Sequence, residues 1–512
     1  MSLVSDLAVA PVLSGGPGPG GRTAPGRGSR FSEPVCDVLL GSRAPSFIVE
    51  EADADGLAAY RALRHRVFVT EQRVFSGHDL DDRDDDPRTV VLVARDGSGA
   101  VVGGVRLGPA AGGPDIGWWS GGRLAVDPAE RNGAGIGPAL VRAACARAEA
   151  AGALRFEATV RAGAERMFTR LGWRRVRPLA VAGLPHVLMR WPVGRIAALV
   201  AATKSDLGTL LAGLAPGGPG FVGDDGAPVP GSDLVAACDA ILPSMVERDP
   251  EWAGWCSVLV NLNDLAAMGA QPVGLLDAVG ARDASAVARV LAGLRRAAEA
   301  YEVPVLGGHT QLGVPAALSV TALGRAREPV PGGGARPGHR VWLTADLGGG
   351  WRPGYTGRQW DSTTHRRTPQ LRAMLGAVAA ARPAAAKDVS MAGVAGTLGM
   401  LAEASGCGAV LDVAAVPRPG AVSMGDWLTC FPGFAMLTAE RPGRPGLDAG
   451  PASGAACGEF VPGGGVRLRW PDGELIEVIT GPVTGLGTAA EPAGSAESAE
   501  PAEPAELREG ET

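Results

Sequence analysis

The stretch NLNDLAAMGAQP, residues 261–272, decides the fold of the second half of this chain. It places one acid, Asp264, where an apolar run turns into a helix of small residues ending at Gly269. A carboxylate in that position can hold a magnesium ion together with phosphate oxygens. Small side chains at Ala266, Ala267 and Ala270 let another backbone pack closely against the helix. The stretch therefore predicts a close-packed helix that carries a phosphate- and metal-binding acid.

The bulk composition is that of a soluble globular protein. The chain has 512 residues, of which 46% are hydrophobic and 20% are charged, so we expect two or three domains rather than one core. The formal net charge is −6, and it arises at the end of the chain, where seven glutamates and one arginine follow residue 490. The remainder is close to neutral, and no basic stripe indicates a nucleic-acid partner.

Cysteine usage and hydropathy indicate the compartment. Seven cysteines are scattered without CxxC pairs, which suits a reducing compartment and argues against a zinc site. No apolar run approaches the roughly 18 residues of a membrane span, and no basic segment followed by an apolar one opens the chain. We therefore expect a cytoplasmic protein that binds neither membrane nor nucleic acid.

Composition divides the chain into five segments. Residues 1–45 are rich in Gly, Pro, Ser and Arg, and residues 486–512 form an acidic tail, so we predict disorder at both ends. Short β-rich runs alternate with helical stretches over 46–195, and a second periodic block follows. A Gly/Pro-rich interruption, VPGGGARPGH, divides the second block into halves 196–330 and 331–485.

The run from 122 to 152, GRLAVDPAERNGAGIGPALVRAACARAEAAG, carries the first chemical motif. Apolar alternation predicts a strand, Asp127-Pro128 ends it, and three glycines lead into a helix. A strand, a glycine turn and a helix N-terminus together present backbone N–H groups to an anion such as a pyrophosphate. The strand and turn residues are Leu124, Val126, Gly133, Gly135 and Gly137.

This run resembles motif A of the GNAT acyltransferases, whose glycine loop holds the pyrophosphate of acetyl-CoA. Two further segments resemble the same family, AERMFTRLGW at 164–173 and RVFVTEQ at 66–72. The resemblance covers 46–195 and implies a mixed, mostly antiparallel sheet flanked by helices, an acyl-CoA donor and an amine acceptor. The family's loop has a basic residue at a position that falls on Asn132 here, and the nearest arginine, Arg131, comes one residue earlier. We therefore assign both Arg131 and Asn132 to the CoA site, together with the strand and turn residues.

The catalytic groups of this segment leave alternatives open. Phe168 stands where many GNATs have a tyrosine that protonates the departing thiolate, and phenylalanine has no proton to donate. Two residues are candidates for the general base: Glu157, on a polar strand face, and His186, whose imidazole exchanges protons near neutral pH. The acid run HDLDDRDDD at 78–86 is either a solvated loop or a site for a cationic amine.

Four motifs accompany residues 261–272 in the second block. They are GDDGA at 223–227, an acid after a strand at Asp239, GGHT at 307–310 and KDVSMAG at 387–393. In this order the motifs resemble those of the AIR synthase (PurM) superfamily, whose members use ATP. The resemblance covers 196–485 and implies a two-half α+β domain, Mg·ATP and a homodimer formed through that domain.

The acids of these motifs suit nucleotide chemistry, because Mg²⁺ prefers carboxylates, phosphate oxygens and water, and phosphoryl transfer depends on positioning and charge neutralisation. His309 replaces the acid of the family's GGDT and Met391 the second acid of its D-x-S-D-G, so the acceptor is not that of a well-known member. The resemblance assigns Asp224, Asp225, Asp239 and Asp264 to the metal, and Gly223, Gly307, Gly308, His309 and Asp388 to ATP. Lys204 is a further candidate for contact with a phosphate.

The sequence thus predicts an α/β and α+β protein, in which a GNAT acyltransferase domain precedes a two-half PurM-like α+β domain between disordered termini. The combination resembles bacterial two-module proteins that accompany nitrilases in nitrogen-scavenging gene clusters. We expect a bifunctional enzyme, a CoA-dependent N-acyltransferase joined to an ATP/Mg-dependent AIR-synthase-like domain acting on a small nitrogenous metabolite. The alternative is a regulatory protein that binds CoA, nucleotide or both, with one or both sites catalytically inactive.

Overall fold

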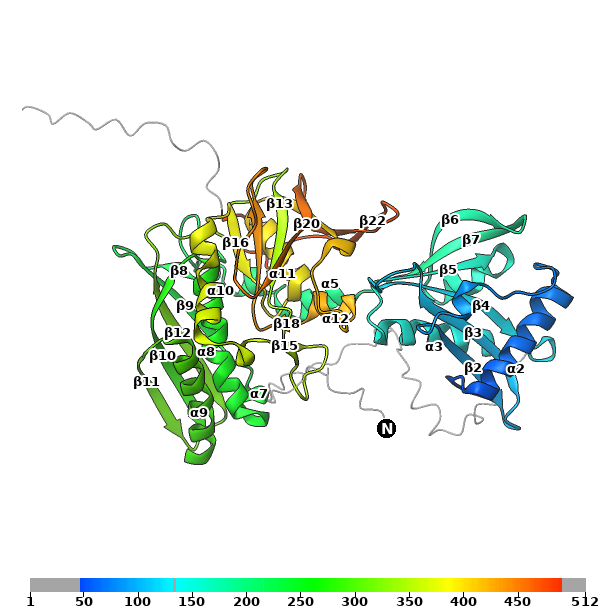
Figure 1. Cartoon of the computed structure of the whole chain (residues 1–512), viewed down its shortest axis with the longest axis horizontal. Helices are drawn as coiled ribbons and strands as arrows, with labels where there is room; N and C mark the ends of the chain where they lie inside the picture. The colour runs from blue at the N-terminus through cyan, green and yellow to red at the C-terminus, as the bar shows by residue number, and fades with distance from the viewer. Residues whose placement is uncertain (1–46, 132–134, 215, 490–512) are drawn as a thin grey trace, which may run out of the picture.

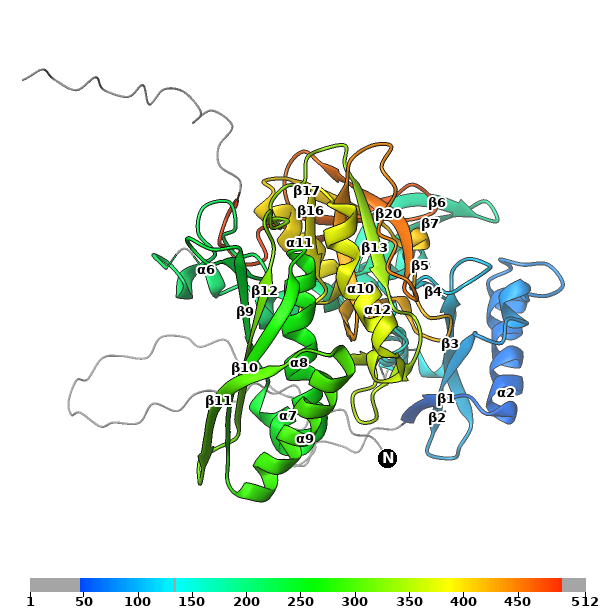
Figure 2. The same ribbon diagram turned by 60° about the vertical axis from the view of Figure 1, so that its left-hand side comes forward.

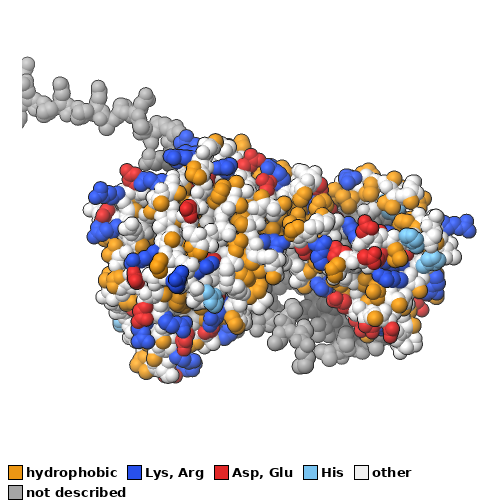
Figure 3. Space-filling view, viewed as in Figure 1, with side chains coloured by type: hydrophobic (Ala, Val, Ile, Leu, Met, Phe, Trp, Pro, Cys, Tyr) orange, Lys and Arg blue, Asp and Glu red, His pale blue; other side chains and the backbone are white. Residues whose placement is uncertain are grey.

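The structure is a computed structural model that describes residues 47–131, 135–214 and 216–489, folded as two lobes (Figure 1). The first lobe comprises residues 47–191 and the second residues 195–489, and the two join through a narrower waist (Figure 3). Both termini that the sequence predicts to be disordered fall largely outside the described residues. Within the described ranges no helix is both long enough and apolar enough to cross a lipid bilayer.

One seven-stranded sheet forms the first lobe. Its neighbouring strands are antiparallel except for β4 and β5, which run parallel. These two strands pair only where Trp118–Gly121 meets Arg155–Ala158, although both continue beyond that point. They therefore diverge and open a gap in the sheet. In spatial order the strands are β1 (Phe47–Glu51), β2 (Val90–Asp96), β3 (Val101–Pro109), β4 (Trp118–Val126), β5 (Arg155–Arg161), β7 (Leu184–Trp191) and β6 (Arg174–Val181).

Helices α2 (Ala54–Arg64) and α3 (Ile136–Ala150) cover opposite faces of this sheet (Figures 1 and 2). Two adjacent glycines of β3 allow both helices to approach, because a Cβ on Gly103 would collide with Ile136 of α3 and one on Gly104 with Tyr60 of α2. Successive strand residues point to opposite faces, so one Gly-Gly pair serves both helices. The shorter helical turns are η1 (His65–Glu71), η2 (Asp82–Asp84), η3 (Pro128–Glu130), η4 (Ala162–Ala164) and α4 (Glu165–Arg170).

A five-stranded sheet and two long helices form the first half of the second lobe. Helices α8 (Pro250–Ala267) and α9 (Ala284–Tyr301) pack against one face, while the other face leaves Leu276 and Leu306 exposed. In spatial order the strands are β11 (Val305–Leu312), β10 (Gln271–Ala281), β12 (Ala317–Arg325), β9 (Leu234–Ala240) and β8 (Ala227–Pro228). Two shorter helices, α6 (Leu207–Leu210) and α7 (Pro243–Arg248), precede α8.

Helix α8 has the boundaries that its sequence predicts. Asp249 accepts a hydrogen bond from the Trp252 N–H, Pro250 opens the helix, and every residue of α8 except Glu251 is buried. The chain leaves the helix at Gly269, whose φ of +66° is a left-handed conformation that glycine adopts without strain. A helix buried on all sides is apolar all round, and the alanines that follow Asp264 keep that character in its last turn.

A seven-stranded sheet forms the second half, with helices α10 (Thr368–Ala381), α11 (Gly393–Ala404) and α12 (Met424–Thr429). In spatial order its strands are β16 (Ala385–Asp388), β19 (Ala435–Glu440), β13 (Arg340–Ala345), β20 (Ser453–Val461), β17 (Gly408–Asp412), β21 (Val466–Arg469) and β22 (Leu475–Ile479). A small sheet of β14 (Gly350–Trp351), β15 (Gln359–Asp361) and β18 (Phe431–Pro432) lies beside it, with turns η5 (Thr363–His365) and η6 (Val413–Ala415). The linking helix α5 (Arg195–Thr203) packs on α11 and α12 of this half.

The two lobes contact each other through a charged junction. The turn between β21 and β22 places Asp472 and Glu474 against Arg155 of β5, with Arg155–Asp472 distances of 3.0 and 2.8 Å and an Arg155–Glu474 distance of 2.8 Å. The Arg155 guanidinium lies 4.0 Å from the ring centre of Trp118 and 5.6 Å from that of Trp470. Arg155 is thus held between two indoles, one from each lobe, and two carboxylates, both from the second lobe.

Candidate active sites

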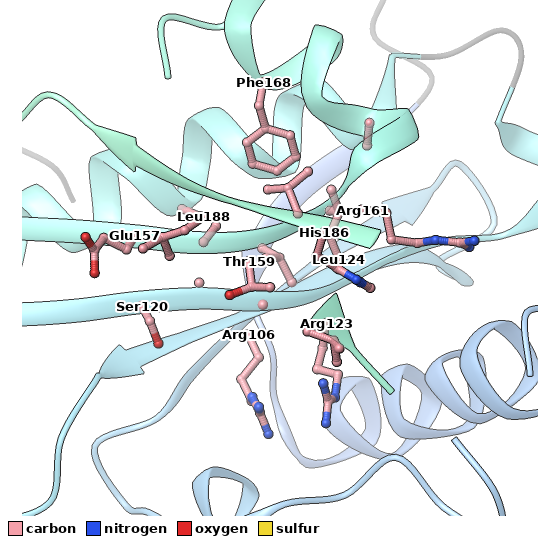
Figure 4. A pocket seen from close by; sticks show the side chains of 18 of the residues that line it. Arg106, Ser120, Arg123, Leu124, Glu157, Thr159, Arg161, Phe168, His186 and Leu188 are labelled. Atoms are coloured by element: carbon pink, nitrogen blue, oxygen red, sulfur yellow. The ribbon is translucent and has the colours of Figure 1, made fainter. Parts of the chain in front are cut away.

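The gap between β4 and β5 contains a cavity of about 560 Å³. Side chains from both faces of the sheet line it, since Phe68 and Arg106 lie on the α2 side and Val141 and Phe168 on the α3 side. Figure 4 shows Phe168 on one side of the diverging strands and Arg106 and Arg123 on the other. The cavity therefore passes through the sheet and gives access to it from two faces.

The glycine turn leads into α3 next to this cavity. Gly135 caps α3 with a φ of +67°, and the first helical turn carries no acidic side chain that would compete with an anion. Leu124 lines the cavity, whereas Val126 lies at the end of β4, 3.8 Å from where a Cβ on Gly137 would be. Arg131 donates hydrogen bonds to the Glu71 carboxylate, one of 2.7 Å, and to the Val126 carbonyl at 3.1 Å. The predicted CoA residues Asn132 and Gly133 lie outside the described residues.

His186 and Glu157, the two candidate bases, both line the cavity but differ in their partners. The His186 Nδ1 lies 2.9 Å from the Leu184 carbonyl, and only a protonated nitrogen can donate to that oxygen. This contact leaves Nε2 as the nitrogen with a free lone pair, and no described residue hydrogen-bonds to it. The arrangement is the one that a neutral histidine base needs.

Glu157 is occupied by other groups. Arg190 donates to one carboxylate oxygen at 2.9 Å, Arg155 lies 3.1 Å from the same oxygen, and the Trp118 indole donates to the other at 3.1 Å. A carboxylate with both oxygens engaged by cations and an N–H is held in one orientation. Glu157 is therefore placed to hold the junction between the lobes, and the geometry favours His186 as the base.

Phe168 packs into the wall of the cavity. Its ring meets the Trp173 indole edge-on at a centroid distance of 5.2 Å, and the side chain is buried. The position that resembles the family's tyrosine thus faces the cavity, as the motif predicts, without a hydroxyl group. A proton for a departing thiolate has to come from water or from another lining group.

The acid run 78–86 forms ion pairs with arginines of the same lobe. Asp79 and Asp84 pair with Arg64 at 2.7 and 2.6 Å, and Asp81 pairs with Arg106 at 2.6 Å. Asp81, the aspartate of the run that lines the cavity, already has a counter-charge, whereas Asp82 and Asp85 are exposed and form no ion pair with a described residue. Inside the cavity the run therefore offers no free acid to a cationic amine, and its exposed members fit the alternative of a solvated loop.

Three carboxylates converge in the second lobe. Asp225, Asp264 and Asp388 each offer an oxygen within 4.8 Å of the other two. They come from the turn before β8, the last turn of α8 and the end of β16, so the site needs both halves of the lobe. Three carboxylate oxygens at such spacing form a donor set that fits a hard divalent cation.

Burial and mutual repulsion control the protonation of this cluster. Burial raises the pKa of Asp264 well above its usual range, and the nearby Asp388 raises it further. Burial and Asp225 raise the pKa of Asp388 in the same way. Burial also raises the pKa of Asp224 to about 6, and one of its oxygens is buried without a hydrogen-bond partner while the other accepts from the Gly332 N–H at 2.9 Å. An orphaned carboxylate oxygen beside three crowded acids fits a bound cation.

Lys387 is the functional residue that the sequence did not indicate. Its buried ammonium donates to Asp225 at 2.7 Å and to the Gly223 carbonyl at 3.0 Å. The Asp388 N–H donates to the other Asp225 oxygen at 3.0 Å. Lys387 therefore fixes the GDDGA turn against β16. The only sequence signal was its position next to Asp388 in the last motif.

The remaining predicted residues divide into two groups. Asp239 and Lys204 lie near the cluster: burial raises the pKa of Asp239, whose side chain still contacts solvent, and the Lys204 ammonium opposes that rise. Gly307, Gly308 and His309 lie on β11, which β10 and β12 separate from β9. Three strand spacings amount to roughly 14 Å. A single copy of the chain does not bring the GGHT motif to the acids.

The fold and these sites define a protein with an acetyltransferase fold in front of a two-half domain with a buried acid cluster. Residues 87–175 match the acetyltransferase (GNAT) domain. Residues 223–326 and 336–445 match the N-terminal and C-terminal domains of AIR synthase related proteins. The chain belongs to the AIR synthase related family and carries an additional GNAT domain in its first lobe.

Curated relatives match part of the chain. An uncharacterized protein of Synechocystis sp. is 37% identical over 229 residues, which cover 43% of this chain and 70% of the relative. An uncharacterized protein of Methanocaldococcus jannaschii is 32% identical over 243 residues, covering 44% of this chain and 73% of the relative. The thiamine-monophosphate kinase of Archaeoglobus fulgidus is 31% identical over 122 residues, covering 23% of this chain and 40% of the kinase.

Proposed function

We propose that the chain is a bifunctional enzyme. In this proposal the first lobe transfers an acyl group from acetyl-CoA or another acyl-CoA to an amine, and the second lobe uses Mg·ATP on a small nitrogenous metabolite. The observation that supports the first activity is the cavity through the sheet, with the free Nε2 of His186 in its wall. The observation that supports the second is the meeting of Asp225, Asp264 and Asp388 from three separate segments.

The acyl transfer needs few protein groups. The amine nitrogen attacks the thioester carbonyl carbon, the carbon–sulfur bond breaks, and CoA leaves as a thiolate. His186 Nε2 accepts the proton that the amine loses, and the Nδ1–H···O=C bond to Leu184 keeps the ring in position. Because Phe168 has no hydroxyl, the thiolate takes its proton from water. The first N–H groups of α3 face the anionic part of the donor.

In the second lobe the carboxylates would hold Mg²⁺ and the chain would position the nucleotide. A bound Mg²⁺ supplies charge neutralisation for the phosphate oxygens of ATP. Asp225, Asp264 and Asp388 are the ligands, and Asp224 and Asp239 stand beside them. Lys387 orders the turn that carries Asp225, and the Lys204 ammonium, which acts on Asp239, would contact a phosphate.

A second copy of the chain completes this proposal. The open face of the five-stranded sheet exposes Leu276 and Leu306, and the glycines and His309 of the GGHT motif lie on the neighbouring edge strand. An exposed apolar sheet face of this kind is typical of an interface. We infer a homodimer through this face, which sedimentation analysis tests: Leu276→Arg should shift a dimer to a monomer, and Leu475→Arg on β22, equally exposed, should not.

A regulatory protein that binds CoA or nucleotide without turnover is the second candidate. Three positions favour it: Phe168 lacks the hydroxyl of the usual acid, His309 replaces an acid, and Met391 is 46% exposed where the resemblance expects another acid. Neither candidate depends on the gene-cluster resemblance, and nitrogen metabolism stays a prediction from that resemblance alone.

Calorimetric titration with acetyl-CoA and with Mg·ATP, paired with CoA-release and ADP-release assays, separates the two candidates. The enzyme proposal expects CoA release with an amine, and a loss of about a hundredfold in His186→Gln. His365→Gln in the second lobe is the matched control and should keep full CoA release. Tight binding of both ligands without turnover across a broad amine panel would reject the enzyme in favour of the regulatory protein.

A further inference from the structure

A network of arginines and aspartates extends from the α2 side of the cavity, and Asp81, Arg83, Arg106 and Arg123 are its cavity-lining members. Arg64, Arg106 and Arg123 contact three aspartates of the acid run, and Arg106 and Arg123 share Asp81 at 2.6 and 3.0 Å. Arg83 belongs to the same loop and lines the same cavity. The members are four arginines, Arg64, Arg83, Arg106 and Arg123, and three aspartates, Asp79, Asp81 and Asp84. The network therefore has one more positive charge than negative charge.

Arg83 is the member without a counter-charge. Among the described residues no carboxylate forms an ion pair with its guanidinium, which donates to the Ser120 hydroxyl and, at 3.0 Å, to the Ala110 carbonyl. Burial and the neighbouring Arg106 lower the pKa of Arg83, although Asp81 and Asp86 act in the opposite sense. Asp86 is itself paired with Arg88 at 2.7 Å, and neither of these two lines the cavity. A half-buried guanidinium at a cavity wall with neutral partners is a site for an anion.

The position of Arg83 separates it from the expected CoA phosphates. The acid run packs on α2, as the Arg61 hydrogen bond to the Asp84 carbonyl at 3.2 Å shows. The glycine turn and α3 belong to the opposite side of the sheet. The phosphates of the donor would therefore lie near α3, and the α2 side is left for the acceptor. Figure 4 shows Arg106 and Arg123 on that side, away from Phe168.

We propose that the acyl acceptor is an amine that carries a carboxylate group, and that Arg83 binds this carboxylate. The inference rests on the proposed acyltransferase activity and names its class of acceptor. The planar fork of a guanidinium matches a carboxylate with two parallel hydrogen bonds, and one excess charge matches one monoanion. A polyamine or another dication would be repelled by the arginines of this wall, because the wall has no unpaired acid to neutralise its charge.

The test compares amino acids with the amines that lack their carboxylate. Glycine and methylamine, β-alanine and ethylamine, and 4-aminobutyrate and propylamine form three pairs of increasing length. Wild-type protein should release CoA with kcat/KM about ten- to a hundredfold higher for the amino acid of at least one pair. Arg83→Gln should abolish that preference while the paired amine and the Kd of acetyl-CoA stay unchanged. Arg88→Gln, an arginine of the same loop outside the cavity, is the matched control and should keep the preference.

Each other outcome overturns the inference or the function beneath it. Equal use of both members of every pair, or an equal loss for both in Arg83→Gln, overturns the carboxylate proposal but leaves the acyltransferase intact. Preference for phosphoethanolamine over every amino acid also overturns it. If no amine releases CoA, the acyltransferase proposal fails, and calorimetric titration of the amino acid then tests the carboxylate proposal by itself. Weaker binding of the amino acid to Arg83→Gln than to wild type supports the carboxylate proposal. Equal binding to both proteins overturns it.

Discussion

Replacing Asp264 by asparagine should stabilise the metal-free protein while it weakens the binding of Mg²⁺. Oxygens of Asp225, Asp264 and Asp388 lie within 4.8 Å of one another. Two like charges at that distance repel by about 3.5 kcal/mol at an effective dielectric constant of 20. Since the pKa of Asp264 is raised, the folded protein holds a proton that the unfolded chain releases at lower pH. The free energy of unfolding therefore falls as pH rises through that raised pKa, and Asp264→Asn removes this loss.

The effect should be largest at alkaline pH without metal. At pH 8 in a chelating buffer we expect Asp264→Asn to raise the free energy of unfolding of the second lobe by up to about 3 kcal/mol. In wild type, Mg²⁺ at a hundred times its Kd should add about 2.7 kcal/mol, because it binds only the folded state. The variant should lose most of this gain, since one of three carboxylate ligands is gone. Calorimetric melting at pH 5 and pH 8, with and without Mg²⁺, measures both changes.

Asp277→Asn is the matched control. Asp277 lies on β10 in the same half of the lobe, its pKa is also raised by burial, and it lies outside the acid cluster. This variant should keep the full response to Mg²⁺. The reasoning is refuted if Asp264→Asn melts at a lower temperature than wild type at pH 8 without metal and still responds fully to Mg²⁺.

Three further changes test the first lobe and its junction. Phe168→Tyr restores a hydroxyl in the cavity wall and should raise the rate of CoA release by about tenfold or more, whereas Phe168→Leu should not. Asp472→Asn removes a partly exposed carboxylate from the buried Arg155 and should destabilise the junction by about 2 kcal/mol, seen as faster proteolysis between the lobes; Asp448→Asn is its surface control. Hydrogen bonds from Arg64 hold the pKa of Asp84 well below its usual range, against the effect of burial. Asp84→Asn should therefore lower stability at pH 7, and its difference from wild type should shrink as pH falls below about 4.

The sequence predicted those features that depend on local pattern. The glycines and Asp127-Pro128 correctly place the turn before α3, and Gly269 ends α8 as predicted. Two domains in the predicted order match the family models. Ordered motifs also identified acids that the fold brings together, Asp225 and Asp264 among them. These predictions hold because turn chemistry and helix caps act over a few residues.

Long-range contacts explain the rest. Glu157 looked like a free acid on a strand face, but Arg190 and the turn that carries Glu474, about 300 residues later, cover it. The acids of the run 78–86 looked solvated or available to an amine, yet Arg64 and Arg106, which belong to other elements, pair with three of them, Asp79, Asp81 and Asp84. Lys387 had no charge pattern around it to reveal its partner Asp225, which lies 162 residues earlier. Pattern along the chain cannot specify which opposite charge arrives from another element.

The position of the lobe junction argues against direct transfer of a product between the two sites. Asp388 ends β16, at one edge of the seven-stranded sheet, while Asp472 and Glu474 precede β22 at the other edge. Six strand spacings separate these edges, roughly 29 Å. A product of one site therefore has to leave into solvent before it reaches the other. Saturating Mg·ATP should accordingly leave the kcat of CoA release unchanged. A change in that kcat would mean that ligand binding at the acid cluster alters the first lobe through the Arg155 junction.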